Sequence, residues 1–324
     1  MDKSRATLLG IALLAFGAAR PVLPQETPAP AQAPSALTSS ILQAFRLLNE
    51  DKVKEARAEL EHAQTLATGP CGECLLGMSY VYSSEKDWKR AKKAVNEAIP
   101  LLKPPGLVAR AYNQLGSASF QSKELEASED AFRRAVSSGG VWGTLARYNL
   151  SQVLLTRRRW AEAAEMARSY IKDAGQAGTA IDQAHIVLCQ ARANLPEEPR
   201  PPFKAAEEVS KDPADARKVE GQVTRPEILS RTNPRYTEEA RKAKVTGTVI
   251  VEAIIDKEGC VTNVRPLHGL PKGLTESAEN AVRRWVFKPA TLAGEPVKVF
   301  YVLTVNFAIQ AGPPPAIALP SIVP

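Results

Sequence analysis

The chain has 324 residues, with 42 Lys and Arg against 35 Asp and Glu, a formal net charge of +7 and a pI near 9.2. Its 44% hydrophobic and 24% charged residues exclude a polytopic membrane protein, a wholly disordered chain and a disulfide-dense miniprotein. This length predicts two domains with linkers, and so small an excess of basic residues does not indicate a nucleic-acid partner.

The first twenty residues have the features of an export signal. Lys3 and Arg5 precede an uncharged apolar stretch, residues 6–19, which is shorter than the ~20 residues needed to span a bilayer. We therefore expect residues 1–20 to be a signal peptide. A short membrane anchor is the alternative, because Arg20 and Pro21 form an awkward cleavage site. Residues 21–36 are rich in Pro and Ala and predict an extended tether.

A helical pattern recurs through residues 37–195. Four segments place apolar or small residues at steps of 3, 4 and 3, which is one face of a helix. Their first members are 35, 37 and 35 residues apart, a period typical of stacked helical hairpins. Gly77, Gly116 and Ser151 precede three of the segments, where two helices are expected to approach closely. The segments are Val53-Ala56-Leu60-Ala63, Trp88-Ala91-Val95-Ala98, Leu125-Ser128-Phe132-Ala135 and Trp160-Ala163-Ala167-Tyr170.

At these positions the sequence resembles the tetratricopeptide repeat. The resemblance implies an all-α solenoid with a concave groove that binds a peptide or protein, and residues 179–194 are expected to form its capping helix. Ordinary solvated helix positions are the simpler interpretation of the groove candidates, because a fold does not specify its ligand. These candidates are Arg110, Asn113, Ser117, Tyr148 and Gln152.

Cys71 and Cys74 form a CxxC pair just before a first helix of this array. Such a pair indicates a redox centre, half of a metal site or a local disulfide. No thioredoxin-like context surrounds it and only His62 is a nearby further ligand, so a disulfide that closes the loop is the favoured interpretation. Cys189 and Cys260 fall in different expected domains, and we expect them to be unpaired.

Residues 196–222 mix Pro with charge and predict a linker. Residues 223–310 then predict an α+β domain with two helices on a three-stranded antiparallel sheet. Its strands are expected at 247–256, 260–267 and 297–309, the last with alternating apolar residues over its whole length. Gly259 is expected to supply a positive φ in the hairpin turn. Residues 311–324 form a Pro-rich tail.

This second domain resembles the carboxy-terminal domain of the TonB family. The motifs occur in order and at family-like spacing, although Tyr236 is followed by Thr237 where the family more often has Pro. The matching residues are Pro234, Tyr236, Ala240 and Arg241; Gly247, Thr248 and Val249; Asp256, Gly259 and Val261; Ala278, Ala281, Val282, Trp285, Phe287, Pro289 and Ala290; and Gly294, Pro296 and Val297.

The resemblance implies a binding domain that engages outer-membrane transporters. In the family, a short box peptide of the transporter adds as an extra strand beside the last strand of the sheet. That contact is expected to be made chiefly by the backbone, because the apolar side chains of the strand serve the core. The residues to which the role is carried over are Val297, Val299, Phe300, Tyr301, Leu303 and Val305.

The sequence contains no GxSxG, HExxH, GxGxxG or P-loop spacing, so we expect no enzymatic activity and no cofactor or metal. The leading hypothesis is an exported periplasmic interaction protein that docks an outer-membrane transporter or another envelope protein, with the repeats holding a second partner. The alternative is an energy-transducing TonB protein, held in the inner membrane and coupled to a motor complex. Against it, the apolar segment is short and lacks the His that the family's membrane helix carries. A third hypothesis is a structural factor whose basic surface holds an anionic cell-wall polymer.

Overall fold

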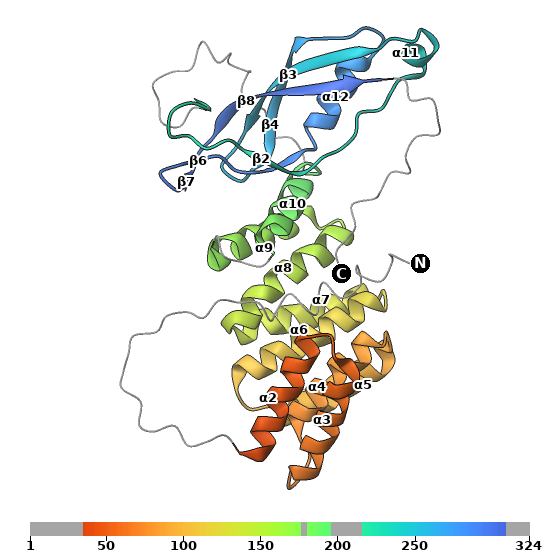
Figure 1. The fold of residues 1–324 in the computed structure, drawn as a ribbon, viewed down its shortest axis with the longest axis vertical. Coiled ribbons are helices and arrows are strands. Elements are labelled where there is room, and N and C mark those ends of the chain that lie inside the picture. The colour runs from red at the N-terminus through yellow and green to blue at the C-terminus, as the bar shows by residue number, and fades with distance from the viewer. Residues whose placement is uncertain (1–34, 176–179, 196–215, 309–324) are drawn as a thin grey trace. The chain divides into compact units, whose positions relative to one another are not determined.

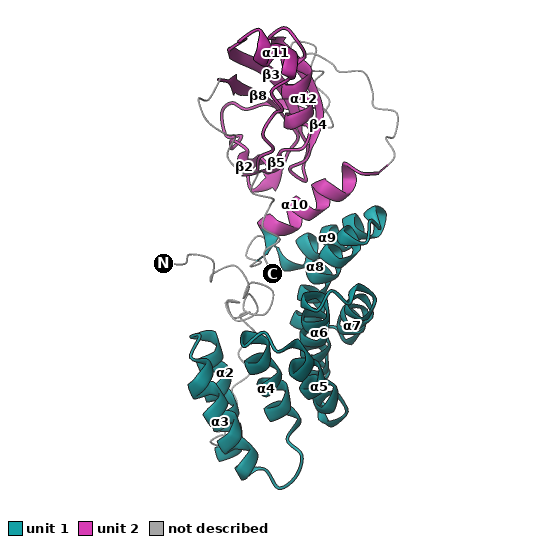
Figure 2. Cartoon of the chain, turned by 90° about the vertical axis from the view of Figure 1, so that its right-hand side faces the viewer, with its two compact units in different colours: residues 1–181, 320–324 teal, residues 182–319 magenta. Residues whose placement is uncertain are grey.

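The computed structural model describes residues 35–175, 180–195 and 216–308. The chain divides into two compact units, with the boundary between Ile181 and Asp182 (Figure 2). The expected signal segment 1–20, nearly all of the tether, the linker as far as residue 215 and the tail 311–324 lie outside the described residues. Within the described ranges, no helix has both the length and the apolar character required to cross a membrane.

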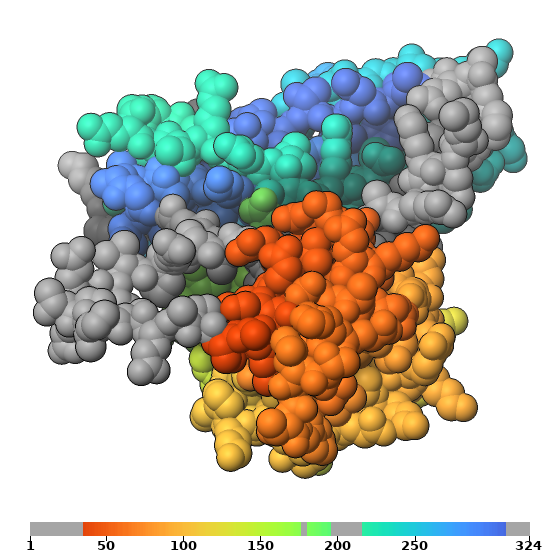
Figure 3. Space-filling view, turned by 60° about the horizontal axis from the view of Figure 1, so that its bottom comes forward, coloured from red at the N-terminus to blue at the C-terminus, as the bar shows by residue number. Residues whose placement is uncertain are grey.

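The first unit is a row of helical hairpins, in which each helix packs against the next along the chain (Figure 1). This arrangement confirms the predicted repeat array. Figure 3 shows the close packing of the first hairpins, drawn in red to orange. The helices are α2 (Ala36–Asn49), α3 (Val53–Leu66), α4 (Gly72–Ser84), α5 (Trp88–Ala98), the short 3-10 helix η1 (Ile99–Leu101), α6 (Pro105–Gln121), α7 (Leu125–Ser138), α8 (Gly140–Thr156) and α9 (Trp160–Ala174).

The second helix of each hairpin buries the predicted face. The opening residue of each of the four segments is half-buried and the three that follow are fully buried. Each hairpin turn contains one residue with a positive φ, so the four turns share this feature of their backbone conformation. These residues are Asp51, Lys86, Lys123 and Arg158.

Two glycines mark the closest approaches between helices. A Cβ atom on Gly116 of α6 would lie 2.7 Å from the ring of Phe132 on α7, which confirms the expected contact within a hairpin. At Gly77 of α4 the close neighbour is Leu60, at 2.5 Å. Leu60 belongs to the preceding hairpin, so this glycine fits two successive hairpins together.

The second unit contains α10 from Asp182 on, and a four-stranded sheet in the order β1-β8-β3-β4. Strands β8, β3 and β4 are antiparallel as predicted, whereas the short β1 runs parallel to β8. Two small antiparallel pairs, β2 with β5 and β6 with β7, complete the unit. Its elements are α10 (Ile181–Arg192), β1 (Arg217–Lys218), β2 (Glu227–Ser230), α11 (Glu238–Lys242), β3 (Gly247–Ile255), β4 (Val261–His268), α12 (Leu274–Val282), β5 (Val286–Lys288), β6 (Thr291–Leu292), β7 (Glu295–Pro296) and β8 (Val299–Phe307).

The core of this unit lies on the sheet face that the alternation predicts. Odd-numbered residues of β3 and β8 pack with one side of α12, and Trp285, which follows that helix, belongs to the same core. The buried indole donates its Nε1–H to the carbonyl oxygen of Thr232, 2.8 Å away. Tyr236 packs edge-on against Phe307, so the entry to α11 is tied to the last strand.

Two expectations differ from the structure, and a third stays a prediction. Residues 216–218 fall in the expected linker but belong to the sheet, because Ala216 is buried against Ile254 and Phe300 and the N–H of Arg217 donates to the carbonyl of Lys298. The role of α10 as the capping helix of the array stays a prediction: from Asp182 on it is grouped with the second unit, and its Ala184, Leu188 and Ala191 are fully buried. The expectation that Cys189 and Cys260 are unpaired is wrong, since they form a disulfide.

Candidate functional site at the edge of the C-terminal sheet

Strand β8 has two different sides. Along its whole length it pairs with β3, from Val299 opposite Ile255 to Phe307 opposite Gly247. On the other side it pairs with β1, at Val299 and Phe300. Within the described residues, no further strand pairs with this side from Tyr301 to Phe307.

One hydrogen bond shows which backbone groups line this open edge. The carbonyl of Lys298 accepts from the N–H of Arg217 at 2.9 Å, so Lys298 directs its backbone polar groups toward β1. In a strand, the N–H and C=O of one residue point to the same side and alternate from residue to residue. Val302, Thr304 and Asn306 therefore direct both groups toward the open edge, and their side chains are exposed. A bare edge of this kind is a template for another strand.

The side chains named from the sequence serve mainly the core. Val299, Leu303 and Val305 are buried in it, and Phe300 is buried with Ala216. Val297 and Tyr301 are half-buried, and Tyr301 packs edge-on against Phe287. The three edge-directed residues Val302, Thr304 and Asn306 were not named from the sequence. The alternation placed them on the face of the strand opposite the core, but the direction of their backbone groups depends on the pairing with β1.

The other edge of the sheet is formed by β4. Leu267 on this strand is 51% exposed, much as Val302 on β8 is 54% exposed. Inside the sheet, the buried Glu252 of β3 accepts from Nε of Arg265 on β4 at 2.9 Å. Leu267 and Val302 are therefore aliphatic residues of similar exposure on opposite edges of the sheet.

The five predicted groove residues lie on α6 and α8, and all five are buried. Interpretation as ordinary solvated positions is therefore wrong. The two helices are joined by a hydrogen bond from Asn149 Nδ2 to Asn113 Oδ1 at 2.9 Å, and Ser117 donates to the carbonyl of Asn113 at 3.0 Å.

Aromatic rings surround the charged member of this group. The guanidinium carbon of Arg110 lies 3.9 Å from the ring centroid of Phe45, 5.2 Å from that of Tyr80 and 5.0 Å from that of Trp142. Cation–π contacts of this kind hold the side chain in one orientation.

At the α8 end of the group, burial and the neighbouring Tyr170 raise the pKa of Tyr148 well above its usual value, so this residue remains a neutral hydroxyl. The buried Oε1 of Gln152 has no hydrogen-bond partner among the described residues. The group therefore contains a neutral hydroxyl and a buried amide oxygen without a hydrogen-bond partner among the described residues.

All four cysteines of the chain are in disulfides. Cys71 and Cys74 are bonded at the start of α4, where Cys71 Sγ also accepts from the N–H of Cys74 at 3.1 Å. The second disulfide joins Cys189 of α10 to Cys260 at the β3–β4 turn. Among the described residues, Asp256, Glu258 and Cys260 are close enough to hold a metal ion. The sulfur of Cys260 is oxidised, however, and Arg192 binds both carboxylates, so the group is already satisfied.

Comparison with known proteins agrees with the architecture of the second unit. Residues 232–309 match the family model of the Gram-negative bacterial TonB protein C-terminal, so this part of the chain is a TonB C-terminal domain. Protein TonB of Escherichia coli (strain K12) is 35% identical over 65 residues, which are 20% of this chain. The match spans only 27% of that protein.

Two crystal structures of MamA resemble the chain at low sequence identity. One is 20% identical with a TM-score of 0.39 and covers 49% of this chain and 81% of its own. The other is 21% identical with a TM-score of 0.38 and covers 46% of this chain and 82% of its own.

Proposed function

We propose that this chain is a non-enzymatic interaction protein of the periplasm that docks an outer-membrane transporter or another envelope protein by β-strand addition. The open edge of β8 carries the proposal. Val302, Thr304 and Asn306 direct their backbone groups away from β3, and a partner strand placed there would extend the sheet. The TonB C-terminal domain at residues 232–309 supports the envelope context.

The pairing with β1 limits where such a strand can lie. Because β1 occupies the edge at Val299 and Phe300, an incoming strand pairs from Tyr301 onward. It gains main-chain hydrogen bonds at every second residue, and the exposed side chains of Val302 and Thr304 contact its side chains. The contact is therefore short and depends mainly on the backbone.

Photo-crosslinking in the intact envelope tests the docking edge. A photoreactive phenylalanine derivative at Val302 is expected to crosslink to one outer-membrane protein, whereas the same probe at Leu267 on the opposite edge is not. The two positions are almost equally exposed, so accessibility does not separate them. Equal crosslinking from both positions, or none from Val302, would contradict docking at β8.

We also propose that the repeat array holds a second protein partner through the Arg110 to Gln152 group. The unused buried Oε1 of Gln152 supports a ligand that donates a hydrogen bond, such as a peptide backbone. Replacement of Gln152 by Leu is expected to weaken capture of that partner without changing crosslinking from Val302. Loss of both together would show that the substitution acts on the fold.

Export is part of the same proposal. Two disulfides are typical of compartments outside the reducing cytoplasm. An intact mass that lacks about twenty residues, in the soluble periplasmic fraction, is the outcome expected of a cleaved signal peptide. A full-length mass in the inner membrane would favour the energy-transducing alternative.

A further inference from the structure

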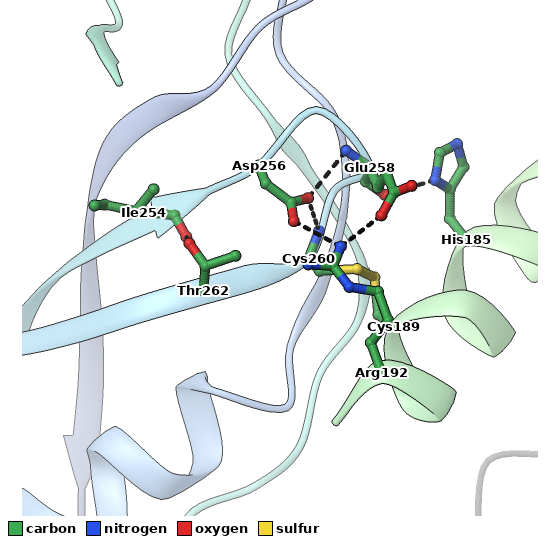
Figure 4. The surroundings of a disulfide bond; sticks show 8 residues. All are labelled: His185, Cys189, Arg192, Ile254, Asp256, Glu258, Cys260 and Thr262. Atoms are coloured by element: carbon green, nitrogen blue, oxygen red, sulfur yellow. Dashed lines mark hydrogen bonds and ion pairs between the residues drawn. A yellow bond between two sulfur atoms is a disulfide. The ribbon is translucent and has the colours of Figure 1, made fainter. Parts of the chain in front are cut away.

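Helix α10 is bound to the turn between β3 and β4 by three kinds of contact (Figure 4). Cys189 is disulfide-bonded to Cys260. Arg192 Nη1 lies 2.7 Å from Asp256 Oδ2 and 2.5 Å from Glu258 Oε2. His185 Nδ1 lies 2.7 Å from the carbonyl oxygen of Glu258. All of these residues belong to the second unit, but α10 lies outside the residues that match the TonB C-terminal family.

The turn that receives the helix is itself rigid. Asp256 Oδ1 accepts from the N–H of Glu258 at 2.9 Å and from that of Cys260 at 3.0 Å. The carbonyl of Gly259 accepts from the N–H of Phe287, a residue of the central core. The Asp256 carboxylate that faces Arg192 is therefore held in place by the turn itself.

The non-covalent part of this attachment is small. Its buried apolar cluster consists of Cys189, Cys260 and Val286, with Ile186 and Leu229 partly buried beside them. The side chains of Arg192, Asp256 and Glu258 are 30%, 16% and 28% exposed, so water partly screens these two ion pairs. The disulfide is thus the contact that makes the attachment permanent.

We propose that Cys189 and Cys260 form an oxidation-dependent clamp that makes α10 part of the C-terminal unit. Formation of the clamp removes two electrons and two protons from the two thiols. A protein disulfide is the oxidant, and it is reduced to its dithiol. In the oxidised chain, the C-terminal unit connects to α9 through residues 175–180. In the reduced chain α10 leaves the turn, and the connection lengthens to include residues 181–215. This inference is independent of the proposed docking at β8.

A specific protease site placed between residues 200 and 210 of the full chain tests the clamp. After cleavage of the otherwise native, oxidised protein, the two fragments are expected to co-elute on size exclusion, and to separate after treatment with a dithiol. In the C189S/C260S variant they are expected to separate without reductant, with less than about a tenth co-eluting at ~10 µM, because the remaining contact is small. The matched control is C71S/C74S, which lacks the other disulfide and should behave as the native protein.

Two results would overturn the clamp. Co-elution of the C189S/C260S fragments without the disulfide would show that the other contacts suffice. Separation of the native fragments without reductant would show that the bond does not form. Hydrogen exchange at β3 and β8 gives a second readout: protection equal to the native protein shows that the variant domain is folded. Should that protection be lost, reduction of the native chain in a C71S/C74S background provides the same comparison.

Discussion

The backbone of Gly259 lies so close to Phe287 that a side chain at this glycine would overlap the peptide group of its neighbour. A Cβ atom would come within 1.8 Å of the Phe287 carbonyl oxygen, and Gly259 has a φ of +83°. The N–H of Phe287 also donates a hydrogen bond to the carbonyl oxygen of Gly259 at 2.9 Å. The turn and β5 are therefore fitted to each other through the glycine.

Substitution of Gly259 by Ala is expected to lower the free energy of unfolding of the second unit by about 3 kcal/mol or more, because backbone strain and a backbone clash add. Gly294 is the matched control: its φ is +87°, but nothing lies within 4 Å of a Cβ there. Gly294→Ala is expected to cost only about 1–2 kcal/mol. Urea unfolding followed by hydrogen exchange at β3 measures both, and equal losses would contradict the clash.

Glu129 should make the repeat array sensitive to acid. Burial alone would raise the pKa of this carboxyl, but the guanidinium groups of Arg133, Arg159 and Arg157 hold it below its usual value. The unfolded state therefore binds the proton more readily. The stabilisation is full above about pH 4.5 and is lost as the pH falls through the lower folded value.

Replacement of Glu129 by Gln is expected to cost about 1–3 kcal/mol at pH 7, since it leaves three cations without their shared carboxylate. It should also flatten the loss of stability below pH 4.5. Asp130→Asn is the control, because Asp130 pairs with Arg134 on an exposed surface and should change stability by less than about 0.5 kcal/mol. Thermal unfolding from pH 3 to 7 measures both, and parallel curves for the two variants would refute the role of Glu129.

Gly116 and Gly106 lie on the same helix but in different surroundings. Gly116→Ala is expected to destabilise the array by about 1–3 kcal/mol, because the new methyl group overlaps the ring of Phe132. Gly106 has open space around it, so Gly106→Ala is expected to stabilise α6 by about 0.5 kcal/mol through helix propensity. Chemical denaturation distinguishes the two, and the same sign for both would contradict the packing argument.

Thr304→Pro should separate docking from folding. Proline removes an N–H that points to the open edge, so the hydrogen bonds to β3 remain and the domain is expected to fold. Crosslinking from the probe at Val302 is expected to fall at least tenfold. Thr304→Ala, which keeps the N–H, should retain it. A similar loss in both variants would show that the threonine side chain, not the backbone, carries the contact.

The alternation of apolar residues was enough to predict β3 and β8, because one buried face imposes period two on a strand, whereas β4, which has no fully buried residue, was predicted as the return strand after the turn at Gly259. It could not predict β1. Arg217 and Lys218 are exposed charged residues, and their place in the sheet rests on backbone hydrogen bonds and on the burial of Ala216 alone. The composition of this segment indicated a linker, because hydrogen bonding between backbones does not depend on which amino acids are present.

The disulfide partner of Cys189 could not be predicted from the sequence for a related reason. Cys260 lies 71 residues further along the chain, beyond a segment that separates two expected domains. The capping-helix interpretation of α10 followed from its amphipathic pattern, which is the same whichever surface a helix covers. The contact of α10 with the turn depends on Arg192 and Glu258, which are ordinary charged residues in the sequence.

The Cys189–Cys260 bond also determines how a pulling force would travel through the molecule. Tension applied by a partner strand at β8 passes into β3 along nine paired residues, reaches the β3–β4 turn and crosses to α10 through sulfur. Under such a force the attachment of α10 to the turn would hold as long as the two sulfur atoms remain bonded.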